Sequence, residues 1–539
     1  MTSIISVFLC ILTLYLFRTI RRNISVRYPP GPWGLPLLGN ALQLPTVKPW
    51  HTLAKWKKTY GPLVYLNMAG QPMIILNSKK TVEDLLDRRA AKYSARPQFI
   101  VANVMTGGFS IIMLPVGERW RKMRRASDLA LGFKNTVNYY TMQRNEAVFS
   151  AHSLLSDPDN WKSHIERTSS STALSLMYDL PLIQSSQDPS IHWMNHYIHE
   201  VVTAMTPGAH LVEMLPFLQH LPWSLSKWRR DAEKFYEGFT TYFEERFRNI
   251  KKLVESGQEQ RPSFCVALAE NQANSEMSDR ECSWLAGAIY GAAHETTATS
   301  MMWFIFCMVL FPHIQTRAQE ELDKVVGRSR LPSFADFKHL PYIHAVVKEI
   351  RVPRCLFRIS QNSLKVLRWR TPVPMGVPHV NSEDDYYDGY YIPKGTICVP
   401  NTWSLHHDPD IYGPDVAKFR PERHLDETGQ LKDGLLGLSE GHYSYGFGQR
   451  ICSGRHVANN SLFIAMATIL WTMRLEGAKD SDGNVMLPDV NGEEENGILS
   501  RPPLFAITAT PRFQDADTFI QEARDEVDQE NLARPDGSH

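Results

Sequence analysis

The chain has almost no net charge and no paired cysteines. Its 539 residues carry 58 basic and 57 acidic side chains, so the formal net charge at pH 7 is +1. This balance gives no global attraction for nucleic acid, which we exclude as a partner. The seven cysteines stand at 10, 265, 282, 307, 355, 398 and 452 without paired spacing. That scatter argues against a disulfide framework or a zinc site and favours a reducing compartment.

The N-terminus has the composition of a membrane anchor. Residues 4–17 are almost all apolar, and Arg18, Arg21 and Arg22 follow them. We therefore predict an anchor over residues 1–20, with its basic flank in the cytosol. A signal peptide that is removed is the alternative. Residues 21–40 are basic and rich in proline, and they are expected to form a stiff linker.

Patterns along the rest of the chain predict a mainly α fold with a minor β lobe. Residues 63–76 alternate like a strand pair turned at Ala69-Gly70-Gln71. Apolar residues recur at helical spacing over residues 78–89, 116–131 and 138–155. We expect one catalytic domain over residues 41–512 and an acidic polar tail over residues 513–539.

A glycine-rich loop around Cys452 carries the clearest chemical signal. Glycines at 446, 448 and 454 allow a flat ligand to approach the backbone closely, and Arg450 stands beside the cysteine. We interpret Cys452 as a metal-bound thiolate, since nearby N–H groups would stabilise the sulfur anion. The alternative is a tight loop holding an inert buried cysteine.

This loop resembles the haem-ligand signature Phe-Gly-x-Gly-x-Arg-x-Cys-x-Gly of the cytochrome P450 family of haem-thiolate monooxygenases. The sequence departs from it only at Tyr445, and the resemblance runs from Pro29 to Arg512. It implies the cytochrome P450 fold, haem b as cofactor, Cys452 as the axial iron ligand and Arg450 as a haem-binding residue.

Two further segments match positions that bind haem propionates in that family. Trp120 and Arg124 lie one helical turn apart and could reach one anionic group together. His379 matches a third such position. The neighbouring Arg121, Lys122 and Arg125 are expected to form a basic patch for an acidic reductase.

Residues 291–297 interrupt a long apolar helical stretch with small and polar side chains. Glu295 can exchange protons and Thr296 can donate a hydrogen bond. The matching family segment delivers protons to bound dioxygen, so these two residues are the predicted catalytic pair. The alternative is a helix crossing in which Glu295 forms a salt bridge.

The family's Glu-x-x-Arg motif is interrupted in this chain. Removing residues 351–366 would place Arg368 three positions after Glu349, and Arg423 would complete a structural network with both. We therefore infer an insertion, either retained untranslated sequence or a genuine loop. Separating a buried Glu349 from its arginine would cost roughly 3–5 kcal/mol.

Together these features predict oxygen insertion from dioxygen into a lipophilic molecule, in secondary metabolism or detoxification. Electrons would come from an NADPH-dependent reductase, and the enzyme would be a single-pass protein of the endoplasmic reticulum membrane with a cytosolic domain. The alternatives are an inactive or non-catalytic haem protein, because of the interrupted motif, and a haem-thiolate enzyme that rearranges peroxides.

Overall fold

The computed structural model describes residues 26–532 apart from 207, 259, 351–369 and 433–442. The chain divides into two compact units. Unit 1 holds residues up to 97, 375–405 and 447–450, and unit 2 holds 98–374, 406–446 and 451 onward. The anchor expected at 1–20 and the insertion expected at 351–366 lie outside the described residues, so both stay predictions.

Unit 1 is built on a four-stranded sheet with the strand order β1-β2-β6-β3. The strands β1 (Leu63–Met68) and β2 (Gln71–Leu76) are antiparallel, with Leu63 opposite Leu76. The turn between them holds Ala69 at φ 51° and Gly70 at φ 98°, as two-residue hairpin turns of this twist require. The strand pair predicted over residues 63–76 is confirmed.

The described part of the expected linker packs on unit 1. The Tyr65 N–H donates to the Pro30 carbonyl (2.8 Å), and the Tyr391 N–H donates to the Arg27 carbonyl (2.7 Å). The ring of Tyr28 packs on the rings of Tyr65 and Tyr391, with centroids 5.1 and 5.9 Å away. This segment is therefore held by backbone and aromatic contacts, which a free spacer would lack.

The remaining elements of unit 1 are short. They are α2 (Pro49–Tyr60), α3 (Lys79–Val82), a π-helical turn (Glu83–Arg88), α4 (Ala90–Tyr93), β3 (His379–Val380), β4 (Asp385–Tyr387), β5 (Tyr390–Ile392), β6 (Ile397–Pro400), a 3-10 turn (Gly448–Arg450) and α17 (Thr402–His406), whose last residue belongs to unit 2.

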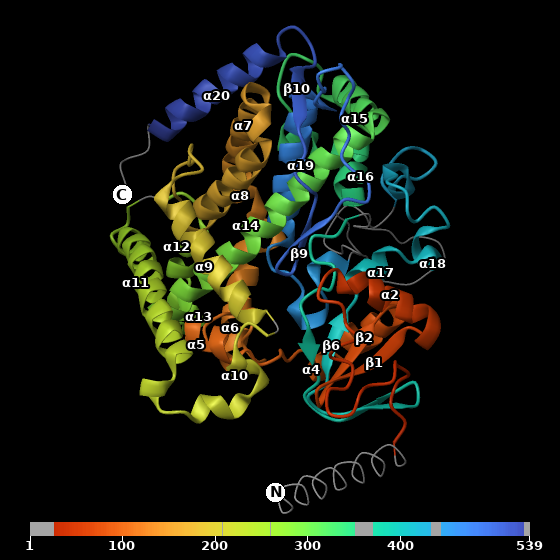
Figure 1. Cartoon of the computed structure of the whole chain (residues 1–539). Helices are drawn as coiled ribbons and strands as arrows, with labels where there is room; N and C mark the ends of the chain where they lie inside the picture. Colours follow the sequence, from red (N-terminus) through yellow and green to blue (C-terminus); the bar gives the residue numbers. More distant parts are fainter. Residues whose placement is uncertain (1–25, 207, 259, 351–369, 433–442, 533–539) are drawn as a thin grey trace, which may run out of the picture. The chain divides into compact units, whose positions relative to one another are not determined.

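Unit 2 is organised around α14 (Asp279–Leu310), a 32-residue helix (Figure 1). It begins with a capping box, since Ser278 accepts from the Glu281 N–H while the Glu281 carboxylate accepts from the Ser278 N–H. Trp284 and Trp303 are fully buried on it. The helix is apolar on nearly all sides because other helices surround it.

Several helices share a hydrophobic core with α14, among them α7 (Tyr140–Ser156), α8 (Trp161–Tyr178) and α19 (Arg455–Thr472). The C-terminal helix α20 (Ala516–Leu532) lies across α7 (Figure 1) and buries Ile520 and Val527. Much of the predicted polar tail is therefore a packed helix, because one of its faces is apolar.

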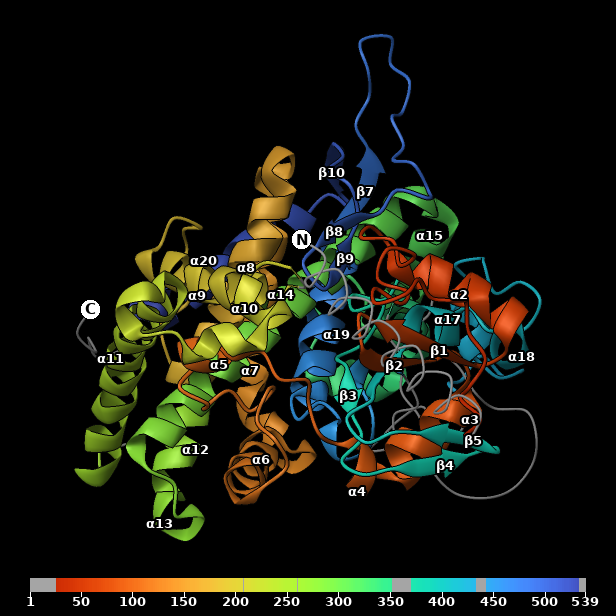
Figure 2. The same cartoon turned by 60° about the horizontal axis from the view of Figure 1, so that its bottom comes forward.

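Unit 2 also contains further helices and pairs of antiparallel strands. The helices are α5 (Ile100–Met105), α6 (Glu118–Leu131), α9 (Pro189–Met205), α10 (Leu211–Met214), α11 (Lys227–Glu255), α12 (Phe264–Glu270), α13 (Gln272–Ser275), α15 (Pro312–Val325), α16 (Pro341–Ile350) and α18 (Pro409–Tyr412), and the strand pairs are β7 (Met473–Gly477) with β10 (Ile507–Pro511) and β8 (Glu494–Asn496) with β9 (Leu499–Arg501). The helices α11 and α12 lie side by side (Figures 1 and 2). Helices predominate and the sheets are small, so the predicted fold class is confirmed.

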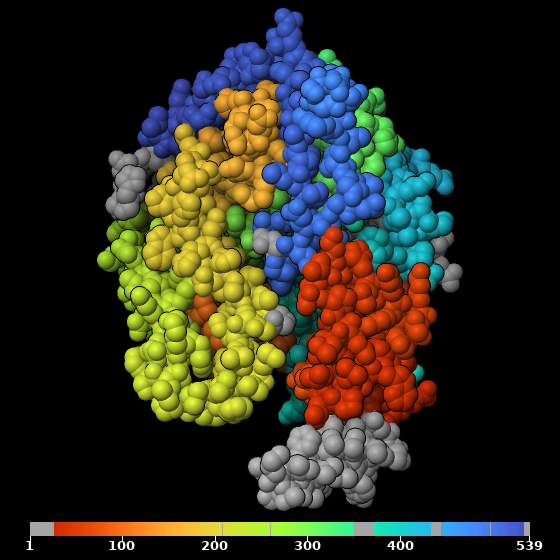
Figure 3. Space-filling model, viewed as in Figure 1, coloured from red at the N-terminus to blue at the C-terminus, as the bar shows by residue number. Residues whose placement is uncertain are grey.

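Residues 211–225 of unit 2 present large apolar side chains to solvent. This stretch belongs to the yellow and yellow-green surface of Figure 3 and comprises α10 and two short 3-10 turns. More than half of each of the following side chains is exposed: Leu211, Met214, Phe217, Trp223 and Leu225. Several exposed apolar side chains along one stretch of chain favour contact with an apolar partner.

No single helix within residues 26–532, as far as they are described, combines the length and apolar character needed to cross a bilayer. The consecutive helices α14 and α15 meet the criteria of length and apolar character only when they are taken together, and the chain bends by 104° between them.

Candidate active site

The loop that carries Cys452 is fixed by backbone geometry. In unit 2 the Cys452 N–H donates to the Tyr445 carbonyl (2.8 Å). In unit 1 the Gly448 N–H donates to Asp87 (2.7 Å), and Gly448 has φ 53°. A Cβ added there would lie 2.1 Å from the Leu86 carbonyl oxygen, so only glycine fits this position.

Cys452 differs from the other described cysteines in its surroundings. It is partly exposed, whereas Cys265, Cys282, Cys307 and Cys398 are buried. Burial raises the pKa of Cys282 to about 12 and raises the pKa of the other three thiols still further above the usual value. A thiolate ligand must be deprotonated, so among these five cysteines Cys452 alone suits a metal.

The helix α6 approaches the cysteine loop within unit 2. Arg124 donates through Nη1 to the carbonyl of Ile451, the residue before Cys452, and through Nε to Asp128 (2.9 Å). Trp120 lies one turn earlier on α6 and is buried. The predicted pair of propionate ligands is thus held on one helix, and Arg124 of this pair reaches the loop that carries the predicted iron ligand.

Unit 1 gathers a separate group of basic side chains. His379 on β3 is buried, with Nδ1 2.7 Å from the Tyr93 carbonyl. Arg450 donates to the Ser94 carbonyl (2.9 Å), and Arg96 donates to the carbonyls of Val377 and Pro378 (2.9 and 2.6 Å). This clustering favours a bound anion, because each cation disfavours the charge of the next.

The pKa values in this group reflect that electrostatic strain. Burial, followed by repulsion from Arg450, lowers the pKa of Arg96 to about 9. Burial, Arg96 and Arg450 hold the pKa of His379 well below its usual value. A carboxylate placed against these groups would oppose both shifts, so the donor set fits a carboxylate-bearing cofactor. The sequence had not identified Arg96, because an isolated arginine after a short helix carries no pattern.

The centre of α14 is open where the rest of the helix is buried. Ala292 is exposed and Ala293 is half-buried, while residues 282–290 and 298–309 are buried. Thr296 donates to the Ala292 carbonyl (2.9 Å), so its hydroxyl lone pairs are available as acceptors. Glu295 accepts from Arg501 (3.4 Å), and burial raises the pKa of its carboxyl above the usual value. The small residues thus leave room beside the predicted acid and alcohol.

Glu349 is fully buried in unit 2 among groups that compensate its charge. Arg423 donates through Nε to one carboxylate oxygen (3.1 Å), and His424 Nε2 lies 2.8 Å from the other. The Arg420 N–H also donates to Glu349 (2.9 Å). Burial lowers the pKa of His424 to about 4, so this imidazole is a neutral donor. Arg368 lies outside the described residues, and its predicted place in the network stays a prediction.

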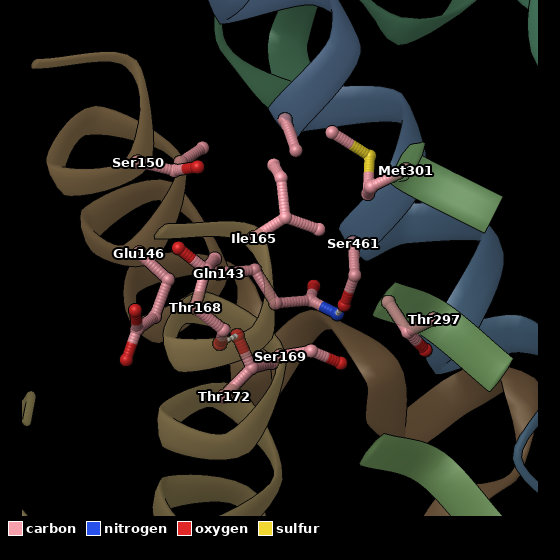
Figure 4. Close-up of a pocket in the computed structure, with 12 residues that line it drawn as sticks. Gln143, Glu146, Ser150, Ile165, Thr168, Ser169, Thr172, Thr297, Met301 and Ser461 are labelled. Carbon is pink, nitrogen blue, oxygen red and sulfur yellow. Dashed lines mark hydrogen bonds between the residues drawn. The ribbon is translucent and has the colours of Figure 1, made fainter. Parts of the chain in front are cut away.

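A small cavity of about 20 Å³ lies between α7, α8, α14 and α19 (Figure 4). Gln143 donates to the Val457 carbonyl and to Ser461, and neither Gln143 Oε1 nor Ser150 Oγ has a hydrogen-bond partner among the described residues. A space of this size has room for about one water molecule. It is too small for an organic substrate, although Thr297 next to the predicted catalytic pair lines it.

These features match one family over nearly the whole chain. The family model described as Cytochrome P450 matches residues 29–507. The chain belongs to the cytochrome P450 family. A cytochrome P450 monooxygenase of Armillaria gallica is 46% identical over 92% of this chain and 92% of its own length. The cytochrome P450 monooxygenase iboC of Amanita muscaria is 36% identical, over 93% of each chain.

A solved zebrafish cytochrome P450, in a structure with abiraterone, shows the same fold. Its TM-score is 0.65 at 23% sequence identity, with 86% of this chain and all of that chain covered. The protein is therefore a cytochrome P450 monooxygenase, an oxidoreductase that uses haem with a cysteine thiolate ligand, a substrate, dioxygen and a redox partner. Cys452, in its glycine-rich loop, suits that thiolate.

The basic patch expected on α6 is smaller than the sequence indicated. Lys122 is paired with Glu118 (3.1 Å) and Glu276 (3.0 Å). Arg121 and Arg125 are exposed one turn apart. Arg119 of this cytochrome P450 helix is exposed too, but it is paired with Glu281 (3.1 Å).

Proposed function

We propose that this monooxygenase inserts one atom of dioxygen into a lipophilic small molecule, with haem b held by Cys452 and electrons supplied by an NADPH-dependent reductase. The observation that carries the proposal is the partly exposed Cys452 in a glycine loop that Arg124 contacts. The alanines at the open centre of α14, Ala292 and Ala293, support an apolar substrate beside the reacting centre.

Bound haem would supply the oxygen activation, and the chain would hold it and manage protons. Cys452 would be the iron ligand and would supply electron density to it. Trp120 and Arg124 would hold a carboxylate of the cofactor, and the basic group of His379, Arg450 and Arg96 has donors that would suit a carboxylate as well. Monooxygenation consumes two electrons and two protons and releases the second oxygen atom as water. Glu295 supplies those protons. The Thr296 hydroxyl oxygen accepts a hydrogen bond and so positions the proton that is delivered.

Replacing Thr296 with alanine tests this proton delivery. We expect NADPH consumption to continue while product formed per NADPH falls at least about tenfold and peroxide rises, because a positioned proton donor is lost. Thr299→Ala is the matched control, since Thr299 lies three residues further along α14 and is buried. Equal coupling in wild type and Thr296→Ala, measured as product and peroxide per NADPH, would contradict the proposed role.

Arg121 and Arg125 are proposed as the docking site for an acidic patch of the reductase. The double variant Arg121→Glu/Arg125→Glu should slow electron transfer about tenfold at low ionic strength, with a smaller difference at high salt, because exposed charges are screened. Stopped-flow reduction at several salt concentrations measures this. Lys234→Glu/Lys252→Glu reverses two exposed charges on α11 and should leave the rate unchanged; a similar loss in that control would refute the site.

We also propose that the protein is anchored to the endoplasmic reticulum membrane by residues 1–20, with its catalytic units in the cytosol. The apolar stretch and basic flank of the sequence support the anchor. The exposed apolar side chains of residues 211–225 support a second membrane contact. Sedimentation of the full chain with membranes, compared with a chain starting at Val26, is the measurement; full recovery of the full chain in the soluble fraction would exclude anchoring.

The proposed substrate is a lipophilic molecule of secondary metabolism or detoxification. Several relatives of at least 30% identity are fungal cytochrome P450 monooxygenases, which supports a role in secondary metabolism or detoxification. A screen of fungal extracts for absorption shifts on binding to the haem-loaded protein would identify the substrate. Binding of hydrophilic compounds alone would contradict a lipophilic substrate.

A further inference from the structure

Arg501 lies between two carboxylates that come from two different helices of unit 2. Its Nη2 is 3.4 Å from Glu295 Oε1 on α14, and its Nη1 is 3.5 Å from Glu166 Oε1 on α8. Both distances are longer than those of a tight ion pair. The guanidinium is therefore shared between the two acids rather than committed to one.

The backbone that carries Arg501 is anchored to α14. Arg501 ends β9, and the preceding residue, Ser500, donates its N–H to the Pro372 carbonyl (2.9 Å). The Ser500 carbonyl accepts from Trp303 Nε1 on α14 (2.9 Å). The end of β9 is thus fixed beside α14. The side chain of Arg501 can change its rotamer while its backbone stays in place.

The second acid is fixed in the same region. Ser169 on α8 donates to the His294 carbonyl of α14 (2.6 Å). Glu166 precedes Ser169 by three residues, so both lie on the same face of α8. This contact keeps Glu166 near Glu295 along α14.

The three side chains form a gradient of exposure from the core to the solvent. Exposure is 14% for Arg501, 23% for Glu295 and 38% for Glu166. Glu166 is thus the acid in better contact with water, and Glu295 is the acid on the helix that carries Thr296. A cation shared between an inner and an outer carboxylate compensates the negative charge of whichever carboxylate it moves toward.

The proton affinity of Glu295 depends on these neighbours. Burial raises its carboxyl pKa, Arg501 opposes that rise, and Glu166 adds to it. His199 on α9 lowers it as well. His294 on α14 is neutral near pH 7, because burial and Arg501 lower its pKa to about 4. The distance of the Arg501 cation from Glu295 therefore changes the proton affinity of Glu295, on top of the larger effect of burial.

We propose that Arg501 is a positioning residue for proton delivery, whose guanidinium exchanges between Glu295 and Glu166. When it pairs with Glu166, the Glu295 carboxylate takes a proton from water and becomes the neutral acid that donates toward Thr296. When that proton has been donated, the carboxylate pairs with Arg501 again. This inference rests on the proposed role of Glu295.

Two neutralising variants test it, because they should move the same group in opposite directions. Arg501→Gln removes the cation and should raise the Glu295 pKa, whereas Glu166→Gln removes the competing anion and should lower it. Arg501→Lys keeps the charge and should restore most of the wild-type value. Infrared or carbon-13 measurement of the Glu295 carboxyl in the haem-loaded protein reports the shift without turnover.

The pH dependence of product per NADPH should shift in the same two directions. Arg474→Gln is the control, since Arg474 on β7 is exposed and paired with Glu476 (2.9 Å), and it should shift neither quantity. Shifts of the same sign in Arg501→Gln and Glu166→Gln, or no shift in either, would overturn the proposal. If the carboxyl shifts as expected while Glu295→Gln keeps full coupling, Arg501 still tunes Glu295 but the proposed role of Glu295 in catalysis fails.

Discussion

The variant Cys452→Ser should lose monooxygenase activity to background while keeping its fold. A serine hydroxyl remains protonated at neutral pH and is a poor donor to iron, so the electron-rich thiolate ligand would be lost. Serine has nearly the shape of cysteine, and the hydrogen bond from the residue 452 N–H to the Tyr445 carbonyl involves only the backbone. The loop should therefore keep its conformation.

The absorption spectrum of the reduced carbon-monoxide complex is the direct measurement, because it reports thiolate ligation. Wild-type protein should show the thiolate band and Cys452→Ser should lack it. Cys282→Ala is the control, since Cys282 is buried on α14 and its thiol pKa is raised to about 12 by burial. A thiolate band in Cys452→Ser, or its loss in Cys282→Ala alone, would show that another cysteine binds the iron.

The variant Glu349→Ala should destabilise unit 2 by about 3–5 kcal/mol, because it leaves the buried Arg423 and His424 without the carboxylate that compensates them. That loss is a large share of the stability of a typical domain. Arg423 keeps its contact with Asp415 (3.1 Å), which places the expected loss toward the lower end of the range.

Denaturant unfolding and the haem content of purified protein measure this effect. Glu476→Gln is the control: Glu476 is an exposed residue paired with Arg474, and its change should cost less than about 1 kcal/mol. Glu349→Gln keeps the shape and one acceptor, so its loss should be intermediate. Unfolding of Glu349→Ala at the wild-type midpoint would mean that the buried network does not support the fold.

The same cluster bears on the interrupted Glu-x-x-Arg motif. In the sequence, an insertion at 351–366 separates Glu349 from Arg368, while Arg423 is the other arginine predicted for this network. In the structure Arg423 does reach Glu349, together with His424, from a segment more than 70 residues further along the chain. The carboxylate is thus compensated within the described residues, which weakens the argument that the interruption prevents folding.

Local patterns made part of the site predictable. The Cys452 loop and the Glu295-Thr296 pair each occupy a few consecutive residues, so both can be found in the sequence, and the resemblance to the cytochrome P450 family supplies the roles predicted for them. The same holds for Trp120 and Arg124, which stand one turn apart on α6. The partners of these residues were not predictable, since Arg96, Glu166 and Arg501 carry no motif and act only through contacts with distant segments.

The sequence by itself determined the helical architecture, the first strand pair, the thiolate loop and the acid–alcohol pair, because periodicity and motif are properties of neighbouring residues. Only the tertiary structure decided which further charges meet. It paired Glu295 with Arg501, 206 positions away, and it added His424 to the pair that the resemblance had predicted for Glu349 and Arg423. It also tied Lys122 to Glu276 and left Arg121 and Arg125 exposed. Burial and packing set these pairings, and neither is written in the spacing of residues along the chain.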